Sequence, residues 1–115
     1  MKYVLLIYTD QLAYAAESSV DYQRSTAYDA YAAAARQEAV LLAAETLYPI
    51  TVATTIRVRD GKTLITDGPF AETPDQLSGY YVLDCLDESV AAHWAAAHPG
   101  LHDGTIEIRP VMPFA

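Results

Sequence analysis

Two stretches of the chain are largely apolar, and two others alternate between apolar and polar residues. Tyr3–Tyr8 and Gly79–Cys85 carry apolar side chains on both sides of an extended backbone, which is typical of strands covered on both faces. Thr54–Arg59 and Thr105–Val111 place apolar residues at every second position, as strands with one covered face do. The pattern therefore predicts four strands, two of which need cover on both sides.

Two helices are expected between these strands. Ser18 or Ser19 can cap the first helix, and the hydrophobic periodicity predicts that this helix continues to about Thr46. One stripe of side chains recurs at intervals of three and four residues: Tyr28, Tyr31, Ala35, Ala39 and Leu42. Asp87 can cap the second helix, and His98-Pro99-Gly100 ends it. We expect the apolar stripe of the first helix to pack on a sheet.

A hairpin and a compact turn occupy the middle of the chain. Asp60-Gly61 is a strong hairpin signal between Thr54–Arg59 and a returning strand over Thr63–Thr66. The segment that follows, Thr66–Thr73, is called the central turn here; its glycine and proline restrict the backbone to few conformations. Thr73-Pro74-Asp75 is expected to begin a short helical turn.

Read in order, the predicted elements are β, α, β, β, β, α, β in a single domain over residues 1–115. The economical solution is α+β: a ferredoxin-like βαββαβ unit with an inserted hairpin strand, an antiparallel sheet and both helices on one face. The other face would then expose the apolar side chains of the two doubly apolar strands. Monomers rarely show so large a patch, so we predict a homodimer that packs sheet against sheet as a dimeric α/β barrel.

The central turn carries two carboxylates, Asp67 and Glu72. A rigid turn can aim both into a cleft, where either would act as a catalytic acid or base if burial raised its pKa toward neutrality. The other interpretation is that Asp67 accepts hydrogen bonds within the turn and Glu72 is solvated. The sequence leaves both interpretations open.

A candidate binding surface follows from the strand alternation. If Ile56, Ile106 and Ile108 face the helices, the intervening residues Arg57, Glu107 and Arg109 lie on the face that the second copy covers. Tyr8 and the central turn border this surface. Buried charges need partners. They either bind a small carboxylated metabolite, which suits the guanidinium fork, or form an Arg–Glu network that orders the dimer.

The histidines and the single cysteine complete the candidate chemistry. His98 shares the apolar side of the second helix and is a candidate catalytic group, whereas the spacing of His93, His98 and His102 is poor for a metal. Cys85 lies in an apolar run, where a buried thiol is the common case. We predict no metal site and no cofactor.

Composition excludes some partners. Fifteen acidic and seven basic residues give a net charge of −8, so nucleic acid and anionic membranes would be repelled. No apolar run approaches the roughly 20 residues that span a bilayer. A cytoplasmic location is the default expectation.

The central turn also carries a family resemblance. Asp67-Gly68-Pro69-Phe70-Ala71-Glu72-Thr73, followed by Gln76-Leu77 and Gly79-Tyr80-Tyr81 and closed by Glu107-Ile108-Arg109-Pro110-Val111, resembles the YCII-related proteins, in particular their DGPF-domain branch. The resemblance covers nearly the whole chain. It implies a dimeric α/β barrel with a pocket near the turn, to which Asp67, Glu72 and Arg109 would contribute.

Two functional hypotheses follow from the residues and the resemblance. In the first, the protein is a lyase or isomerase of a carboxylated metabolite. In the second, it is a non-catalytic ligand-binding or regulatory module, since relatives are often encoded beside extracytoplasmic-function sigma factors. The chain departs from the branch at Pro74-Asp75, where Lys-Glu is common, and at Ser78, where a glycine is common. No lysine role can therefore be carried over to this turn.

Overall fold

The computed structural model describes residues 1–10 and 21–113, and for residues 21–25 it describes the backbone alone. Within these residues the secondary structure is, in chain order, β1 (Lys2–Asp10), α2 (Asp21–Gln37), β2 (Leu41–Thr46), the 3-10 turn η1 (Ile50–Val52), β3 (Thr54–Arg59), β4 (Lys62–Asp67), β5 (Asp75–Asp84), α3 (Glu88–Ala96), the 3-10 turn η2 (Pro99–His102) and β6 (Gly104–Pro110).

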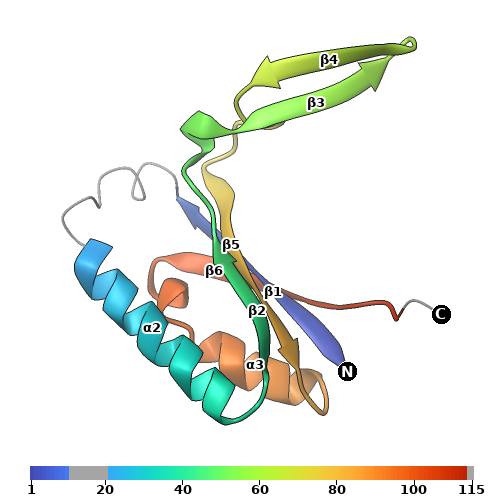
Figure 1. Ribbon diagram of the computed structural model, residues 1–115. Helices are drawn as coiled ribbons and strands as arrows, with labels where there is room; N and C mark the ends of the chain where they lie inside the picture. The colour runs from blue at the N-terminus through green and yellow to red at the C-terminus, as the bar shows by residue number, and fades with distance from the viewer. Residues whose placement is uncertain (11–20, 114–115) are drawn as a thin grey trace.

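The main sheet has four antiparallel strands in the order β2-β5-β1-β6. Helices α2 and α3 both cover one face of this sheet and leave the other face open (Figure 1). The two β-α-β units, β1-α2-β2 and β5-α3-β6, interleave as in ferredoxin-like proteins. The predicted α+β fold class, with helices on one face of an antiparallel sheet, is confirmed.

The core lies between the sheet and the helices. Every second side chain of β1 is buried there, and Leu5 and Leu83 have no exposed surface at all. The remaining apolar members come from β1, from both helices and from β5 and its end: Tyr3, Ile7, Tyr31, Ala35, Tyr81, Cys85, Ala91 and Ala95. Each large side chain buried in this way stabilises the fold by about 1.5–3 kcal/mol. Burial also raises the pKa of the Cys85 thiol, which agrees with a packing role.

The open face of the sheet is apolar at its centre. Val4 and Leu6 of β1 lie beside Val82 and Tyr80 of β5 in the strand register, and all four side chains are half-buried in the single chain. The prediction that β1 and β5 are apolar on both faces is confirmed.

The first helix is shorter than predicted, because α2 ends at Gln37 and not near Thr46. Ala39 takes a left-handed backbone conformation with φ 60°. The amide of Val40 then donates to the carbonyl of Ala35 at 3.0 Å, and the amide of Ala39 donates to Arg36 at 2.9 Å, which is a Schellman motif. This motif usually has glycine where Ala39 stands, so the sequence carried no stop signal. The expected cap at Ser18 or Ser19 lies outside the described residues.

The residues after this stop form β2, which takes the place expected for Thr54–Arg59 in the main sheet. Leu41 and Ala44 pack on the core, whereas Leu42 is 51% exposed. The stripe predicted to continue through Ala39 and Leu42 is therefore wrong beyond Ala35. Helical and strand patterns overlap in this short apolar run, and only the backbone reversal at Ala39 separates them.

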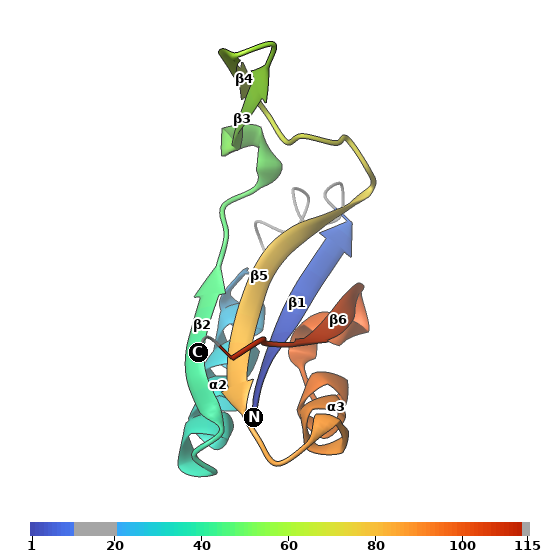
Figure 2. The same cartoon turned by 90° about the vertical axis from the view of Figure 1, so that its right-hand side faces the viewer.

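The predicted hairpin is confirmed, but it forms a separate two-stranded sheet. Strands β3 and β4 pair from Thr54 with Asp67 to Arg59 with Lys62. Asp60 and Gly61, with φ of 52° and 73°, form the tight turn that favours such hairpins. The hairpin projects from one end of the main sheet on the side away from the helices (Figures 1 and 2). Its Ile56 is 65% exposed, so the expectation that Ile56 faces the helices is wrong.

The connection from the hairpin back to the main sheet also differs from the prediction. Thr73 does not begin a helical turn; its hydroxyl donates to the carbonyl of Asp75 at 2.9 Å, and Asp75 begins β5. The second predicted helix is confirmed as α3. The Asp87 carboxylate caps it by accepting the Val90 amide at 3.1 Å.

Candidate functional site

The central turn is fixed by hydrogen bonds at both of its ends. The Gly68 amide donates to the Ala53 carbonyl at 2.7 Å, and the Thr55 hydroxyl donates to the Gly68 carbonyl at 2.7 Å. Gly68 has a φ of 105°, which side-chain-bearing residues rarely adopt. On the other side, the Gln76 side-chain amide donates to the Ala71 carbonyl at 2.6 Å. The turn is therefore a rigid support for the residues around it.

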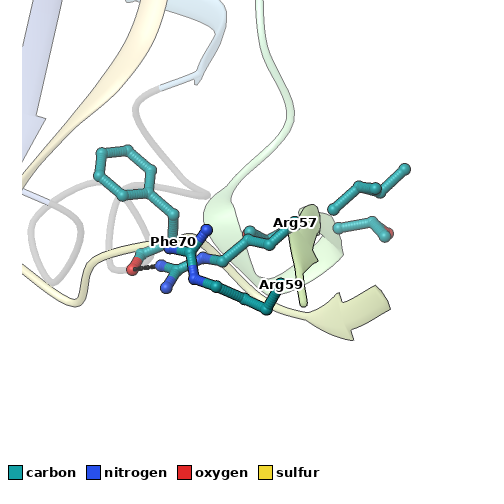
Figure 3. Close-up of a pocket in the computed structure, with 6 residues that line it drawn as sticks. Arg57, Arg59 and Phe70 are labelled. Carbon is teal, nitrogen blue, oxygen red and sulfur yellow. Dashed lines mark hydrogen bonds between the residues drawn. The ribbon is translucent and has the colours of Figure 1, made fainter. Parts of the chain in front are cut away.

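A pocket of about 630 Å³ lies between strand β3 and this turn. Its lining residues are Thr54, Thr55, Ile56, Arg57, Arg59 and Phe70. The volume is in the range of small-molecule sites, although the pocket is open to solvent. Figure 3 shows both arginine side chains extending from β3 toward the segment that carries Phe70. The pocket thus joins an apolar wall to two guanidinium groups.

The two arginines are held differently. The Arg57 guanidinium donates to the Phe70 carbonyl at 3.0 Å, whereas the Arg59 guanidinium donates to the neighbouring Val58 carbonyl at 3.1 Å. The bond to Phe70 ties the pocket to the central turn and orients Arg57. One Nη of Arg57 makes this bond, and the remaining donors of the guanidinium stay free for a ligand.

Three of the seven basic residues of the chain lie on this face of the hairpin. Arg57 and Arg59 are two positions apart on β3, and Lys62 pairs with Arg59 across the hairpin, so all three point to the same side. Among the described residues, the salt bridge that forms joins the Met1 amino group to Asp84 at 3.0 Å, and neither arginine has a carboxylate partner. In a protein of net charge −8, these cations make this face of the hairpin locally basic.

The two carboxylates of the central turn border the pocket but do not enter its lining. Asp67 ends β4 and Glu72 follows Phe70, and both side chains are exposed in the protomer. An acid or base of this kind needs burial to work near neutral pH. The protomer by itself does not provide that burial.

The other predicted binding residues lie on the main sheet, apart from the hairpin. In the strand register Tyr8 lies opposite Thr105, while Glu107 and Arg109 lie opposite Leu6 and Val4 on the open face. Ile106 and Ile108 pack against the core, so their predicted orientation is confirmed. The structure therefore places Tyr8, Glu107 and Arg109 on one surface and Arg57 on another sheet.

His98 lies on the opposite, helix-covered face of the main sheet. It is 3% exposed, and its ring contacts three tyrosine rings with centroids 4.6–5.0 Å away: Tyr28, Tyr31 and Tyr81. Its Nδ1 accepts the Gly100 amide at 2.9 Å, so the neutral ring carries its proton on Nε2. Burial lowers the pKa of His98 to about 4.

The surroundings of His98 are those of a packed core residue. Nε2 is buried without a hydrogen-bond partner, and the neighbouring Tyr31 hydroxyl donates to the Trp94 carbonyl at 2.7 Å. Burial also raises the pKa of Tyr81 to about 12. These groups stay neutral at physiological pH, and His98 and the hairpin pocket do not share a surface.

Arg59, Lys62 and Phe70 were not predicted as site residues from the sequence. A signal for Arg59 was present, because it follows Arg57 by two positions in an alternating strand. Lys62 could have been placed from the same hairpin register. The proximity of the Phe70 carbonyl to Arg57 depends on the path of the central turn, which no local pattern specifies.

Neither a metal centre nor a membrane span is found in the described part of the chain. No group of three or more potential metal ligands forms among residues 1–10 and 21–113. None of the helices in these ranges has the length and apolar character needed to cross a bilayer.

Comparison with known proteins places these features in a wider setting. The family model of the YCII-related domain matches residues 1–115, which include the hairpin and the central turn as well as the main sheet. An uncharacterized protein of Rhizobium meliloti (strain 1021) is 45% identical over 69 residues, or 56% of this chain and 54% of that protein. The chain thus spans about half the length of this curated relative.

Proposed function

The chain belongs to the YCII-related domain family, and we propose that it is a binding protein that takes a small carboxylated metabolite into the pocket between β3 and the central turn. The observation that carries the proposal is the pair of guanidinium groups, Arg57 and Arg59, that line this pocket without a carboxylate partner among the described residues. A guanidinium binds a carboxylate through two parallel hydrogen bonds.

The surroundings of the two arginines support a small and partly apolar ligand. Phe70, which is 77% exposed, borders the same pocket as the two cations, whereas the side chain of Ile56 points to the opposite face of β3. An acidic chain of net charge −8 disfavours polyanions such as nucleic acid. A metabolite with one or two carboxylates and a short carbon skeleton satisfies both the cations and the apolar wall.

A binding role without chemistry is favoured over a lyase or isomerase reaction. Asp67 and Glu72, the groups that would move a proton, are exposed in the protomer, and neither lines the pocket. The protein would then hold its ligand as a sensor or carrier. A catalytic role would require a second copy to bury one of these carboxylates.

We also propose that the protein is a homodimer that covers the open face of the main sheet. The support is the apolar centre of that face, formed by Val4, Leu6, Tyr80 and Val82. Native mass spectrometry of gently purified protein tests this proposal. We expect a dimer at micromolar concentration, and a monomer alone would contradict it.

Calorimetric titration with a panel of mono- and dicarboxylates tests the binding proposal. We expect Arg57→Gln and Arg59→Gln each to weaken binding by about tenfold or more, in line with the ~1.5–3 kcal/mol of a charge-assisted hydrogen bond. Arg36→Gln, at the exposed end of α2, is the matched control and should bind as the wild type does. Equal losses in all three variants, or no saturable binding by the wild type, would overturn the proposal.

A further inference from the structure

The β3–β4 hairpin exposes a continuous apolar face. Ile56 and Ile65 lie opposite each other in the hairpin register, and Val58 is two positions from Ile56 on the same face. These three side chains are 65%, 69% and 62% exposed. A two-stranded hairpin is marginally stable in water by itself, and this one lies outside the main sheet. The exposed face therefore indicates an interaction surface.

The position of the hairpin shows where its occupant would lie. The hairpin projects on the same side as the open face of the main sheet, so hairpin and sheet form the two arms of an L (Figures 1 and 2). The radius of gyration is 16.0 Å, whereas a compact domain of this length has about 13 Å. A layer of protein on the open sheet face would also lie against the hairpin.

The charges favour a second copy of the same chain as that layer. The other face of the hairpin is cationic through Arg57, Arg59 and Lys62. The open sheet face carries two carboxylates and one cation beside its apolar centre, since Glu45 lies opposite Tyr80, Glu107 opposite Leu6 and Arg109 opposite Val4 in the register. Two copies of net charge −8 repel each other, and a basic hairpin placed on the acidic partner reduces that repulsion.

We infer that the β3–β4 hairpin is an exchanged arm, which packs its apolar face of Ile56, Val58 and Ile65 on a second copy of this chain. The inference rests on the sheet-to-sheet dimer proposed above and extends it. In a two-fold arrangement each copy gives one arm and receives one. Because Arg57 joins this arm to the central turn, packing of the arm on the partner also fixes the position of the anion pocket.

Sedimentation equilibrium tests the arm with the triple variant Ile56→Thr, Val58→Thr, Ile65→Thr. Threonine keeps the strand preference but removes apolar contact from six side chains per dimer. We expect the dimer dissociation constant to rise by at least about a hundredfold. Leu86→Thr changes an even more exposed apolar side chain, 86% accessible, in the loop after β5, and should leave the constant unchanged. Far-ultraviolet circular dichroism verifies that the main sheet still folds.

Hydrogen exchange on the wild type gives a second test that needs no variant. The amides of β3 and β4 should exchange more slowly at protein concentrations above the dissociation constant than below it. The arm is contradicted if the hairpin exchanges equally at both concentrations, or if the triple variant dimerises like the wild type. If the arm is contradicted in this way but Leu6→Glu dissociates the dimer, the exchanged arm is wrong and the sheet-to-sheet dimer is supported. A wild-type monomer at all concentrations overturns both.

Discussion

The main sheet with its helices and the β3–β4 hairpin are built on opposite principles. In the main sheet, alternate residues of β1 and β5 are buried, and the buried Ser78 hydroxyl donates to the Ile7 carbonyl. In the hairpin every residue of β4 is exposed, and the side chains form an apolar face and a cationic face. The first region has the contacts that stabilise a protomer, whereas most side chains of the second are exposed.

This difference indicates where stability and recognition reside. Binding groups tend to lie on segments that a rigid scaffold positions. Here the hairpin and the central turn carry the unpaired arginines, while the buried aromatic cluster around His98 belongs to the scaffold. Substitutions in the two regions should therefore change different properties, and four predictions follow the expected size of the effect.

The largest difference is expected between two leucine truncations. Leu5→Ala in β1 removes a side chain with no exposed surface and should lower the free energy of unfolding by about 3–5 kcal/mol. Leu64→Ala in β4 removes one that is 47% exposed and should change it by less than about 1 kcal/mol. Urea denaturation followed by tryptophan fluorescence measures both. Similar losses would mean that the hairpin is part of the cooperative core.

A pH dependence of stability is expected from the buried His98. With a pKa of about 4 in the fold and about 6.5 when unfolded, the unfolded chain binds the proton more readily. Stability is thus complete above pH 6.5 and falls by about 3 kcal/mol as the pH drops to 4. His98→Asn, which keeps an acceptor at the start of η2, should lose this slope.

The matched control for the pH experiment is His102→Asn, since His102 is exposed. Denaturation curves between pH 4 and 7.5 should show the wild-type dependence of stability on pH in this variant. The same carboxylates titrate in both histidine variants, so comparing the two variants removes the carboxylate contribution. A wild-type slope in His98→Asn would contradict the assignment.

Reciprocal changes between glycine and alanine should have opposite signs in the two regions. Gly68→Ala forces a side chain onto a φ of 105° and should weaken the central turn by about 1–2 kcal/mol. Ala39→Gly relieves the left-handed residue at the end of α2 and should stabilise the protomer by about 0.5–1 kcal/mol. Thermal unfolding should detect the second change, while faster amide exchange in the turn should report the first. A lower melting temperature for Ala39→Gly would contradict the account of the helix end.

The smallest effects on stability are expected at Asp67 and Glu72. Both side chains are exposed, so Asp67→Asn and Glu72→Gln should each change the free energy of unfolding by less than about 0.5 kcal/mol. Carboxylate affinity should rise slightly in both variants, because a nearby negative charge is removed. A large loss of stability would show that these carboxylates are buried in the dimer. That result would favour the hypothesis that one of them acts as a catalytic acid or base.

Much of the fold could be predicted from the sequence, because periodicity reports burial directly. The doubly apolar strands, the Asp87 cap and the Asp60-Gly61 hairpin all have local signals. The end of α2 could not be predicted, since Ala39 occupies a position where glycine is the usual signal. This error also caused the second strand of the main sheet to be misassigned. Because the predicted helix included Leu41–Thr46, Thr54–Arg59 was the next strand-like segment and was predicted to join the main sheet.

The candidate site was predictable only in part. Arg57 and the rigidity of the central turn follow from residue type and spacing. That Arg57 lies on a different sheet from Glu107 and Arg109 depends on long-range topology, which alternation within one strand does not report. The burial of His98 was expected from its place on the apolar side of the second predicted helix, but the surrounding tyrosines come from α2 and β5, which are far apart in the chain.

The central claim, that the hairpin and the central turn form the binding region, is tested most directly by mapping a bound carboxylate with nitrogen-15 NMR. We would titrate the labelled wild-type protein with the best ligand from the carboxylate panel and follow every backbone amide. The account predicts saturable shifts at Thr55, Arg57, Arg59 and Phe70, with little change around His98. Shifts confined to the helix-covered face or to the open sheet face around Arg109, or none with any carboxylate, would contradict it.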